Sequence, residues 1–292
     1  MSGLVGSRLA MRAKLWRHPR QMVFAALWYV FLGGAAVAVI MPYLWMLSTS
    51  LKGTAELFTY PPTWIPRVWR FRNYLDAWNA APFALYFFNS LFVALVVTLG
   101  QLVTCSLAAY AFARMEFKGK NVAFALYLST TMISEQATLI PSYLLLKELN
   151  WLDTYMALTV PFLANAFGIF MLRQAFMTIP RELEDAATMD GCGRLRFLGQ
   201  VILPLTKPVL ASQALFAFMN NWNSYLWPLI VTTSKHLRTI QVGLRYFVGQ
   251  EGGTQWGIFM AATVFVSLPV VLVYFLVQKS FVEGIAMTGV RG

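Results

Sequence analysis

Charge is scarce in this 292-residue chain, in which 12% of residues are charged and 58% are hydrophobic. Soluble domains carry about 25% charged residues, so this balance excludes a soluble globular protein. The two cysteines, Cys105 and Cys192, lie far apart and offer neither a disulfide framework nor a metal-ligand spacing. His18 and His236 also stand alone, so the sequence suggests neither a metal site nor a Ser/His/Asp catalytic set.

A phosphate-binding loop is also missing. The pattern G-x-x-x-x-G-K-[ST] needs a glycine five positions before its second glycine. The Gly119-Lys120 pair has Arg114 at that position. The chain is therefore predicted not to be an enzyme and not to hydrolyse ATP itself.

Long apolar runs are what the chain does contain, and they predict six transmembrane helices. Each run approaches or exceeds the roughly 20 residues that a bilayer requires, and continuous rather than alternating apolar residues favour helices over strands. The predicted spans are residues 22–47, 86–113, 122–146, 155–172, 209–231 and 256–277. A signal peptide is the alternative for the first run, but that run exceeds the usual hydrophobic length of ~7–15 residues. The fold class is thus an all-α polytopic membrane protein, with a basic tail (1–21) and one transmembrane domain (22–292).

Lysine and arginine are distributed unevenly between the two predicted sides. With the N-terminus inside, the inner segments hold fifteen of the 23 basic residues and the outer segments hold eight. Because cytoplasmic loops carry the excess of Lys and Arg, both termini are predicted to be cytoplasmic. The same bias explains the net charge of +11, which would otherwise suggest nucleic acid.

The longest polar break, residues 179–208, is predicted to form a compact helical element. Pro180 suits the first helical position, where its missing N–H is harmless. Three acids follow in the first turn, where the helix dipole favours negative charge, and Gly191 is a natural C-terminal stop. The acids are Glu182, Glu184 and Asp185. Helical spacing places Leu183, Ala186, Ala187 and Asp190 on one face, giving a small-residue docking surface at the two alanines.

A second amphipathic piece follows the glycine and leads to Pro204. Its predicted apolar side carries Leu195, Leu198 and Val201. The alternative for the whole segment is an interfacial helix that merely caps a membrane bundle.

This segment resembles the cytoplasmic loop of permease subunits in binding-protein-dependent ABC importers. The signature of that loop is E-A-A, three residues, Gly, nine residues and I-x-L-P. Here Asp185-Ala186-Ala187 is followed at the same spacing by Gly191 and then by Val201-Ile202-Leu203-Pro204, with Asp for Glu and Val for Ile. The extended form E-L-E-D-A-A-x-M-D-G is similar to the carbohydrate-uptake branch, of the maltose-permease type. The resemblance covers residues 73–292.

The resemblance implies a heterodimer with a second permease subunit, two cytoplasmic ATPases that bind ATP and Mg²⁺, and an external solute-binding protein. No cofactor is implied in this chain, and the location is the cell membrane of a prokaryote. The closing tail, residues 286–292, resembles family tails that approach the ATPases. The residues that the resemblance assigns to ATPase coupling are Glu184, Asp185, Ala186, Ala187, Asp190, Gly191, Leu203 and Pro204.

Polar residues inside the predicted spans are candidates for the solute path. Asn amides beside aromatic faces can hydrogen-bond to and stack on sugar rings, although such amides also join helices and such aromatics form interfacial belts. The candidates in the fifth span are Asn221, Asn223 and Tyr225. In the third span, Thr131, Ser134, Glu135, Thr138 and Ser142 fall on one predicted helical face.

Glu135 is the one acid predicted deep in the membrane, either as a path residue or as a protonated structural acid. A carboxylate on the path disfavours an anionic solute, which tilts the expectation towards neutral sugars. The alternatives are an importer for glycerol phosphate or a polyol, and an ion-coupled secondary transporter that uses Glu135. A membrane-embedded enzyme would need a catalytic constellation, which the chain lacks.

Overall fold

The computed structural model describes residues 19–248 and 254–289, and within these ranges the backbone forms helices and turns without a strand. Most of the predicted basic tail and the last three residues of the closing tail lie outside the described residues. The α-helices are α2 (Pro19–Ser50), α3 (Thr54–Leu57), α4 (Arg72–Asn79), α5 (Phe83–Arg114), α6 (Lys120–Ser129), α7 (Glu135–Glu148), α8 (Tyr155–Thr159), α9 (Ala166–Met177), α10 (Glu182–Met189), α11 (Arg194–Phe197), α12 (Leu203–Leu205), α13 (Lys207–Trp222), α14 (Leu226–Val231), α15 (Ile240–Leu244) and α16 (Trp256–Gly289). Short 3₁₀ segments are η1 (Thr130–Met132), η2 (Val160–Phe162) and η4 (Arg245–Phe247), and η3 (Leu198–Ile202) is a π-helical turn.

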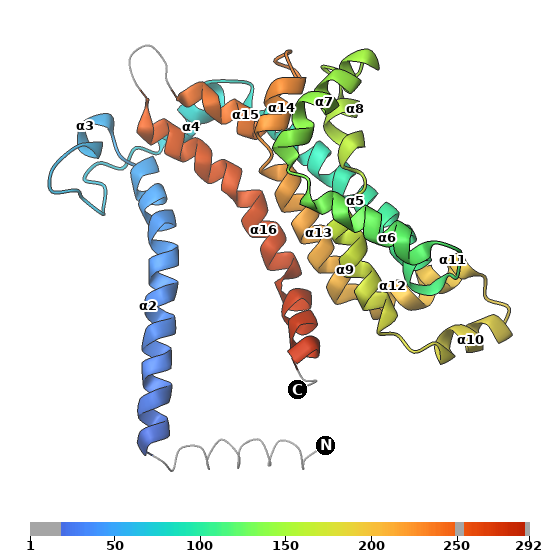
Figure 1. The fold of residues 1–292 in the computed structure, drawn as a ribbon. Helices are drawn as coiled ribbons and strands as arrows, with labels where there is room; N and C mark the ends of the chain where they lie inside the picture. Colours follow the sequence, from blue (N-terminus) through green and yellow to red (C-terminus); the bar gives the residue numbers. More distant parts are fainter. Residues whose placement is uncertain (1–18, 249–253, 290–292) are drawn as a thin grey trace.

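Helices α5, α9 and α13 form the centre of the molecule, with α16 packed against α13 (Figure 1). Helix α2 contacts α16 and then diverges from it along its length (Figure 1). Helix α2 starts, and helix α16 finishes, on the side of the molecule that carries α10 (Figure 1). Helices α4, α14 and α15 lie on the opposite side (Figure 1). The polar loop and both described chain ends therefore share one end of the bundle.

The described residues contain four helices long and apolar enough to cross a membrane, and a fifth if one bent pair is counted. They are residues 22–50, 83–114, 155–177 and 256–278, with the bent pair formed by 194–205 and 207–222 at 87°. The all-helical, multi-pass architecture is thus confirmed. Length and composition of the helices identify four or five of the six predicted spans.

The span predicted over residues 122–146 is expected to be interrupted at Pro141, and the structure places the interruption earlier. The chain breaks at Ile133 and Ser134, whose ψ angles of 121° and 138° are extended. Ser134 is the N-cap of a new helix with Glu135 in its first turn, a combination that starts helices. Pro141 lies inside α7 and not at the break. The predicted single polar face is therefore divided, with Thr131 in η1 and the other members at or after the start of α7.

The fourth span is also interrupted, between η2 and α9, and side chains from neighbouring helices satisfy the freed backbone groups. Gln101 of α5 donates from Nε2 to the carbonyl of Phe162 at 2.8 Å and accepts a bond from Nε2 of Gln213 at 3.1 Å. Asn165 caps α9 by accepting the backbone N–H of Gly168 at 3.0 Å. Broken helices persist at membrane depth only where such partners exist, so these amides hold α5, α9 and α13 together.

Candidate functional site

Helix α10 confirms the predicted helix in the polar loop, with a small shift at its start. The helix begins at Glu182 after Arg181 as N-cap, so Pro180 precedes the cap and does not occupy the first helical position. Glu182, Glu184 and Asp185 lie in the first turn, as predicted. Their charges face the positive end of the helix dipole, which stabilises this eight-residue helix.

The end of α10 is closed by Gly191, whose φ of +75° places it in the left-handed region. Its N–H donates to the carbonyl of Thr188 at 3.0 Å, and the N–H of Cys192 donates to the carbonyl of Ala187 at 2.8 Å. These two bonds form a Schellman motif, which satisfies the last carbonyls of a helix and requires a residue that tolerates positive φ. The glycine therefore fixes the direction in which the chain leaves α10.

Arg114, in the last turn of α5, ties α10 to the bundle. Its guanidinium donates to the backbone carbonyls of Phe176 and Ile179 at 2.7 and 2.5 Å, and it lies 3.6 Å from the carboxylate of Glu184. The Arg114 side chain is 3% exposed, and the hydroxyl of Tyr110 also reaches Glu184 at 3.5 Å. One buried cation thus joins the end of α5, the end of α9 and the first turn of α10.

The two faces of α10 have different surroundings. Ala187 packs on an apolar cluster that includes Phe176 and Phe197, and Cys192 packs on the same cluster. Ala186 and Asp185 are exposed, and Met189 is 90% exposed. The outer face thus presents a small apolar surface that the described residues leave uncovered.

The second piece of the loop differs from its predicted face. The prediction placed Leu195, Leu198 and Val201 on one apolar side, but Leu195 is 71% exposed whereas Leu198 is buried. The buried residues are Phe197, Leu198 and Ile202. The π-helical turn η3 changes the angular step between residues, so a 3.6-residue period fails across it.

Leu203 and Pro204 open helix α12, where Leu203 is half-buried against the apolar cluster and Pro204 is exposed. The structure therefore brings Glu184, Ala187 and Leu203 into contact with the body of the protein. It leaves the other predicted coupling residues at the surface: Asp185, Ala186, Asp190, Gly191 and Pro204.

The candidate path residues lie on two breaks in the helices. Glu135 is exposed at the start of α7. Thr131 and Thr138 are also exposed, and their hydroxyls donate to the carbonyls of Leu128 and Glu135, three residues earlier in each case. At the other break, Asn223 ends α13, and Tyr225 precedes α14. The structure shows Glu135 as an exposed residue in the first turn of α7, at the break that divides the predicted third span, and its depth in the membrane stays a prediction.

The three candidate path residues of the fifth span differ in their contacts and exposure. Asn221 donates to the carbonyl of Ala217 in its own helix at 2.8 Å. Asn223 is exposed and accepts from Gln241 at 3.4 Å. Tyr225 is 40% exposed. Among the described residues, no hydrogen bond or ion pair joins these side chains to Glu135, so whether the two groups line one path stays a prediction.

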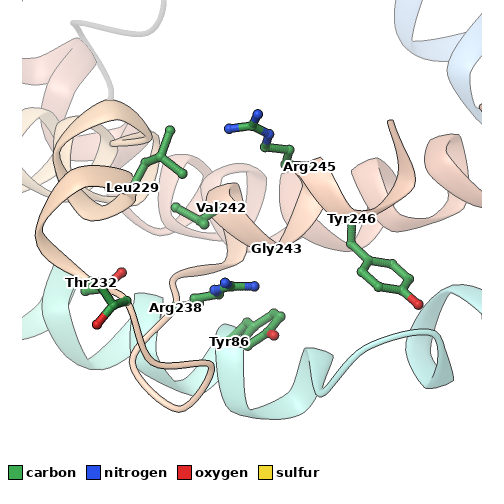
Figure 2. Close-up of a pocket in the computed structure, with 9 residues that line it drawn as sticks. Tyr86, Leu229, Thr232, Arg238, Val242, Gly243, Arg245 and Tyr246 are labelled. Carbon is green, nitrogen blue, oxygen red and sulfur yellow. The ribbon is translucent and has the colours of Figure 1, made fainter. Parts of the chain in front are cut away.

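A pocket of about 440 Å³ lies at the end of the molecule opposite α10, between the start of α5 and the segment from α14 to η4 (Figure 2). Its lining residues are Tyr86, Leu229, Thr232, Thr233, Arg238, Val242, Gly243, Arg245 and Tyr246. Sequence reasoning missed this pocket because its walls come from segments far apart in the chain. The one available signal was the basic character of the loop after the fifth span.

Comparison with known proteins identifies the family. Residues 22–286 match the family model described as the binding-protein-dependent transport system inner membrane component. The chain belongs to this family. It is 36% identical over 265 residues to the sn-glycerol-3-phosphate transport system permease protein UgpE of Yersinia enterocolitica, an alignment covering 88% of this chain and 94% of that protein. It is 33% identical over 267 residues to the probable ABC transporter permease protein YurM of Bacillus subtilis, covering 90% and 88%.

Two solved structures are also similar to this chain. A chain from the crystal structure of a bacterial ABC transporter involved in the import of the acidic polysaccharide alginate superposes with a TM-score of 0.81 at 25% identity, covering 91% of this chain and 99% of that chain. A second match, to the alginate transporter in complex with a pentasaccharide-bound periplasmic protein, has a TM-score of 0.62 at 14% identity and supports the fold alone. The protein is therefore an inner-membrane permease of a binding-protein-dependent ABC importer, and the alternative of an ion-coupled secondary transporter is set aside.

Proposed function

We propose that this permease forms half of the translocation path for a sugar or sugar-like solute that an external solute-binding protein delivers. A second, homologous permease supplies the other half, and two cytoplasmic ATPases supply the energy. The observation that carries the coupling part of this proposal is helix α10, an exposed helix with a capped end and a buried tether to α5. Relatives named for sn-glycerol-3-phosphate transport and a structural relative that imports an acidic polysaccharide support a hydroxyl-rich solute.

The proposed mechanism depends on α10 moving together with the bundle. Closure of the ATPase dimer pushes the exposed face of α10, which carries Ala186 and Met189. Because Arg114 binds Glu184 as well as carbonyls at the end of α9, the push reaches α5 and α9 directly. A soft connection would dissipate the differential binding energy that drives the change from inward- to outward-facing.

The proposed topology has six spans with the α10 end in the cytoplasm. The α6–η1–α7 segment and α13 then supply the spans that length alone does not identify. Cys192, which is half-buried beside α10, tests the orientation, and Cys105, which is buried, provides an internal negative control. A membrane-impermeant thiol reagent should label Cys192 in inside-out vesicles prepared without the ATPase. Labelling from the external face alone would reverse the orientation.

Transport assays test the function itself. The complete complex in vesicles should take up the solute of its binding protein with ATP, and collapse of ion gradients should leave uptake unchanged. Ala186→Glu should abolish uptake and weaken recovery of the ATPase, because a bulky charge on a closely packed docking surface adds a clash and a desolvation penalty. Ala55→Glu, at an exposed alanine in α3, is the matched control and should transport normally. Normal uptake by Ala186→Glu would remove α10 from the mechanism.

A further inference from the structure

The pocket opposite α10 has two arginines and no acid among its lining residues. Arg238 is half-buried beside Tyr86, and Arg245 is exposed on another side of the pocket (Figure 2). Among the described residues, neither guanidinium forms an ion pair with a carboxylate. The pocket therefore carries two positive charges that the described part of the chain does not neutralise.

The wall that carries Arg238 is fixed by a buried asparagine. Asn89 of α5 is fully buried, and its Nδ2 donates to the carbonyls of His236 and Arg238 at 2.7 and 3.0 Å. Tyr155 of α8 donates its hydroxyl to Oδ1 of Asn89 at 2.7 Å, which fixes the orientation of the amide. Ser90 accepts the N–H of Ile240 at 2.7 Å. These bonds hold the backbone of the pocket loop before any ligand arrives.

Hydrogen bonds and close packing also hold the other walls of the pocket in place. Asp153 accepts the N–H groups of Thr233 and Ser234 at 3.0 Å each, which orders the threonine side of the pocket. Helix α15 approaches α5 so closely that a Cβ on Gly243 would lie 2.5 Å from the ring of Tyr86. The pocket is thus bounded by a packed aromatic floor and an ordered loop. Such preorganised sites bind ligands without first losing conformational entropy.

The lining combines two kinds of chemistry. Guanidinium groups bind phosphate and carboxylate through paired N–H donors, which makes arginine well suited to these anions. The hydroxyl-bearing side chains of Thr232, Thr233 and Tyr86 can bond to the hydroxyls of a polyol. A volume of about 440 Å³ lies within the usual range of small-molecule sites.

We propose that this pocket binds the anionic group of a phosphorylated or carboxylated polyol or sugar, at the outer mouth of the transport path. Arg238 and Arg245 bind the anion, and the threonine side of the pocket contacts the hydroxyls. This assignment rests on the proposed function and narrows its solute class from sugar-like compounds to anionic ones. It differs from the sequence-based expectation of a neutral solute, which rested on a carboxylate at Glu135 facing the path.

Direct binding to the purified complex in nanodiscs, without the binding protein and at fixed ionic strength, tests the assignment. The probes are sn-glycerol 3-phosphate and D-glucuronate, each compared with a neutral counterpart, glycerol or glucose. At least one anionic probe should bind tenfold or more tightly than its counterpart. The double variant Arg238→Gln/Arg245→Gln should remove most of that preference. The control Arg67→Gln/Arg72→Gln, which removes the same charge at exposed arginines outside the pocket, should retain it.

Three outcomes would overturn the assignment: equal binding of charged and neutral probes, an equal loss in the control, or an unchanged preference in the pocket variant. A separate measurement tests the competing explanation, in which the anion that binds the pocket is an acidic side chain of the solute-binding protein. If the pocket variant weakens docking of that protein while probe binding is unchanged, the pocket serves docking and not the solute. ATP-dependent uptake by the wild-type complex is measured separately, so a failure of this assignment is distinct from a failure of the proposed function.

Discussion

The guanidinium of Arg114 in α5 lies 3.6 Å from the carboxylate of Glu184 in α10. The two residues are 70 positions apart in the sequence (184 − 114). The two side chains are 3% and 27% exposed, so water screens the pair far less than a surface ion pair. A second pair near the same loop, Arg181 with Glu116, has the same separation of 3.6 Å but is 71% and 81% exposed. Two ion pairs of equal length thus differ almost entirely in burial.

Removing the buried pair should uncouple ATP hydrolysis from transport. Loss of the Glu184 carboxylate leaves the buried Arg114 guanidinium without its counter-charge. This loss should destabilise the attachment of α10 to α5 by about 2–3 kcal/mol. We expect Glu184→Gln to lower uptake at least tenfold while basal ATP hydrolysis persists, measured side by side on the reconstituted complex. Arg181→Gln should leave both rates nearly unchanged, because exposed pairs contribute about 0–1 kcal/mol. Equal effects of the two variants would show that burial of the pair is irrelevant to coupling.

Gly191 should be irreplaceable although the space around it is open. A Cβ there meets nothing within 4 Å, so the constraint is its φ of +75° alone. A non-glycine residue in this conformation loses about 1–2 kcal/mol, and proline cannot adopt it. Gly191→Pro should therefore abolish transport with membrane insertion intact, and Gly191→Ala should weaken co-purification of the ATPase. Gly193→Ala is the matched control, since Gly193 has a φ of −70° and equally open space.

Much of the α10 loop could be predicted because its signals are local. The acids of the first turn and Gly191 at the end act on backbone groups within a few residues. The Arg114–Glu184 pair could not be predicted, because it depends on how α5 and α9 pack. In the sequence, Arg114 stands only as the first residue after the second predicted span, residues 86–113.

The errors also have local physical causes. The break before Glu135 falls between two apolar segments, so hydropathy shows no gap, and Pro141 suggests an interruption at the wrong place. Ser134 followed by an acid was the available signal for the new helix. Likewise, Leu195 is exposed in the short helix α11 whereas Leu198 is buried at the start of the π-helical turn, so the predicted apolar face does not run along one regular helix.

The close approach of α9 and α13 makes Gly168 sensitive to a single methyl group. A Cβ there would lie 2.4 Å from Nε2 of Gln213, whose amide is held by Gln101. Gly168→Ala should therefore displace this amide and lower stability by about 1–3 kcal/mol. The measurement is the thermal midpoint of the purified complex. Gly199→Ala, where a Cβ meets nothing within 4 Å, should leave the midpoint unchanged.

Acid should loosen the threonine side of the pocket. The backbone N–H groups of Ser234 and Thr233 hold the pKa of Asp153 below its usual range. A depressed pKa in the folded state means that the stabilisation is present above the ordinary value of about 4 and is lost as pH falls through the lower, folded pKa. Hydrogen exchange at residues 233 and 234, corrected for intrinsic rates, should rise in that acid range. At neutral pH, Asp153→Asn should raise it and Asp76→Asn, in an exposed pair with Arg72, should not.

Glu135 offers the sharpest test of the predicted solute path. It begins α7 directly after the break in the chain, and it is exposed in the isolated subunit. A side chain in this position either faces the path or contacts the second permease. If it faces the path, Glu135→Gln should change the uptake rate or the preference between charged and neutral solutes, because the shape is kept and the charge is lost. Complex assembly should stay normal.

Glu148 provides the matched control for that test, since it is an exposed acid at the opposite end of the same helix. Glu148→Gln should leave both uptake and solute preference unchanged. A contact with the second permease predicts a different pattern, in which Glu135→Ala and Glu135→Gln reduce recovery of the heterodimer and leave solute preference unaltered. Normal uptake and preference in both Glu135 variants would remove this residue from the path, and the search for the solute contacts would then move to Asn223 and Tyr225 at the other break.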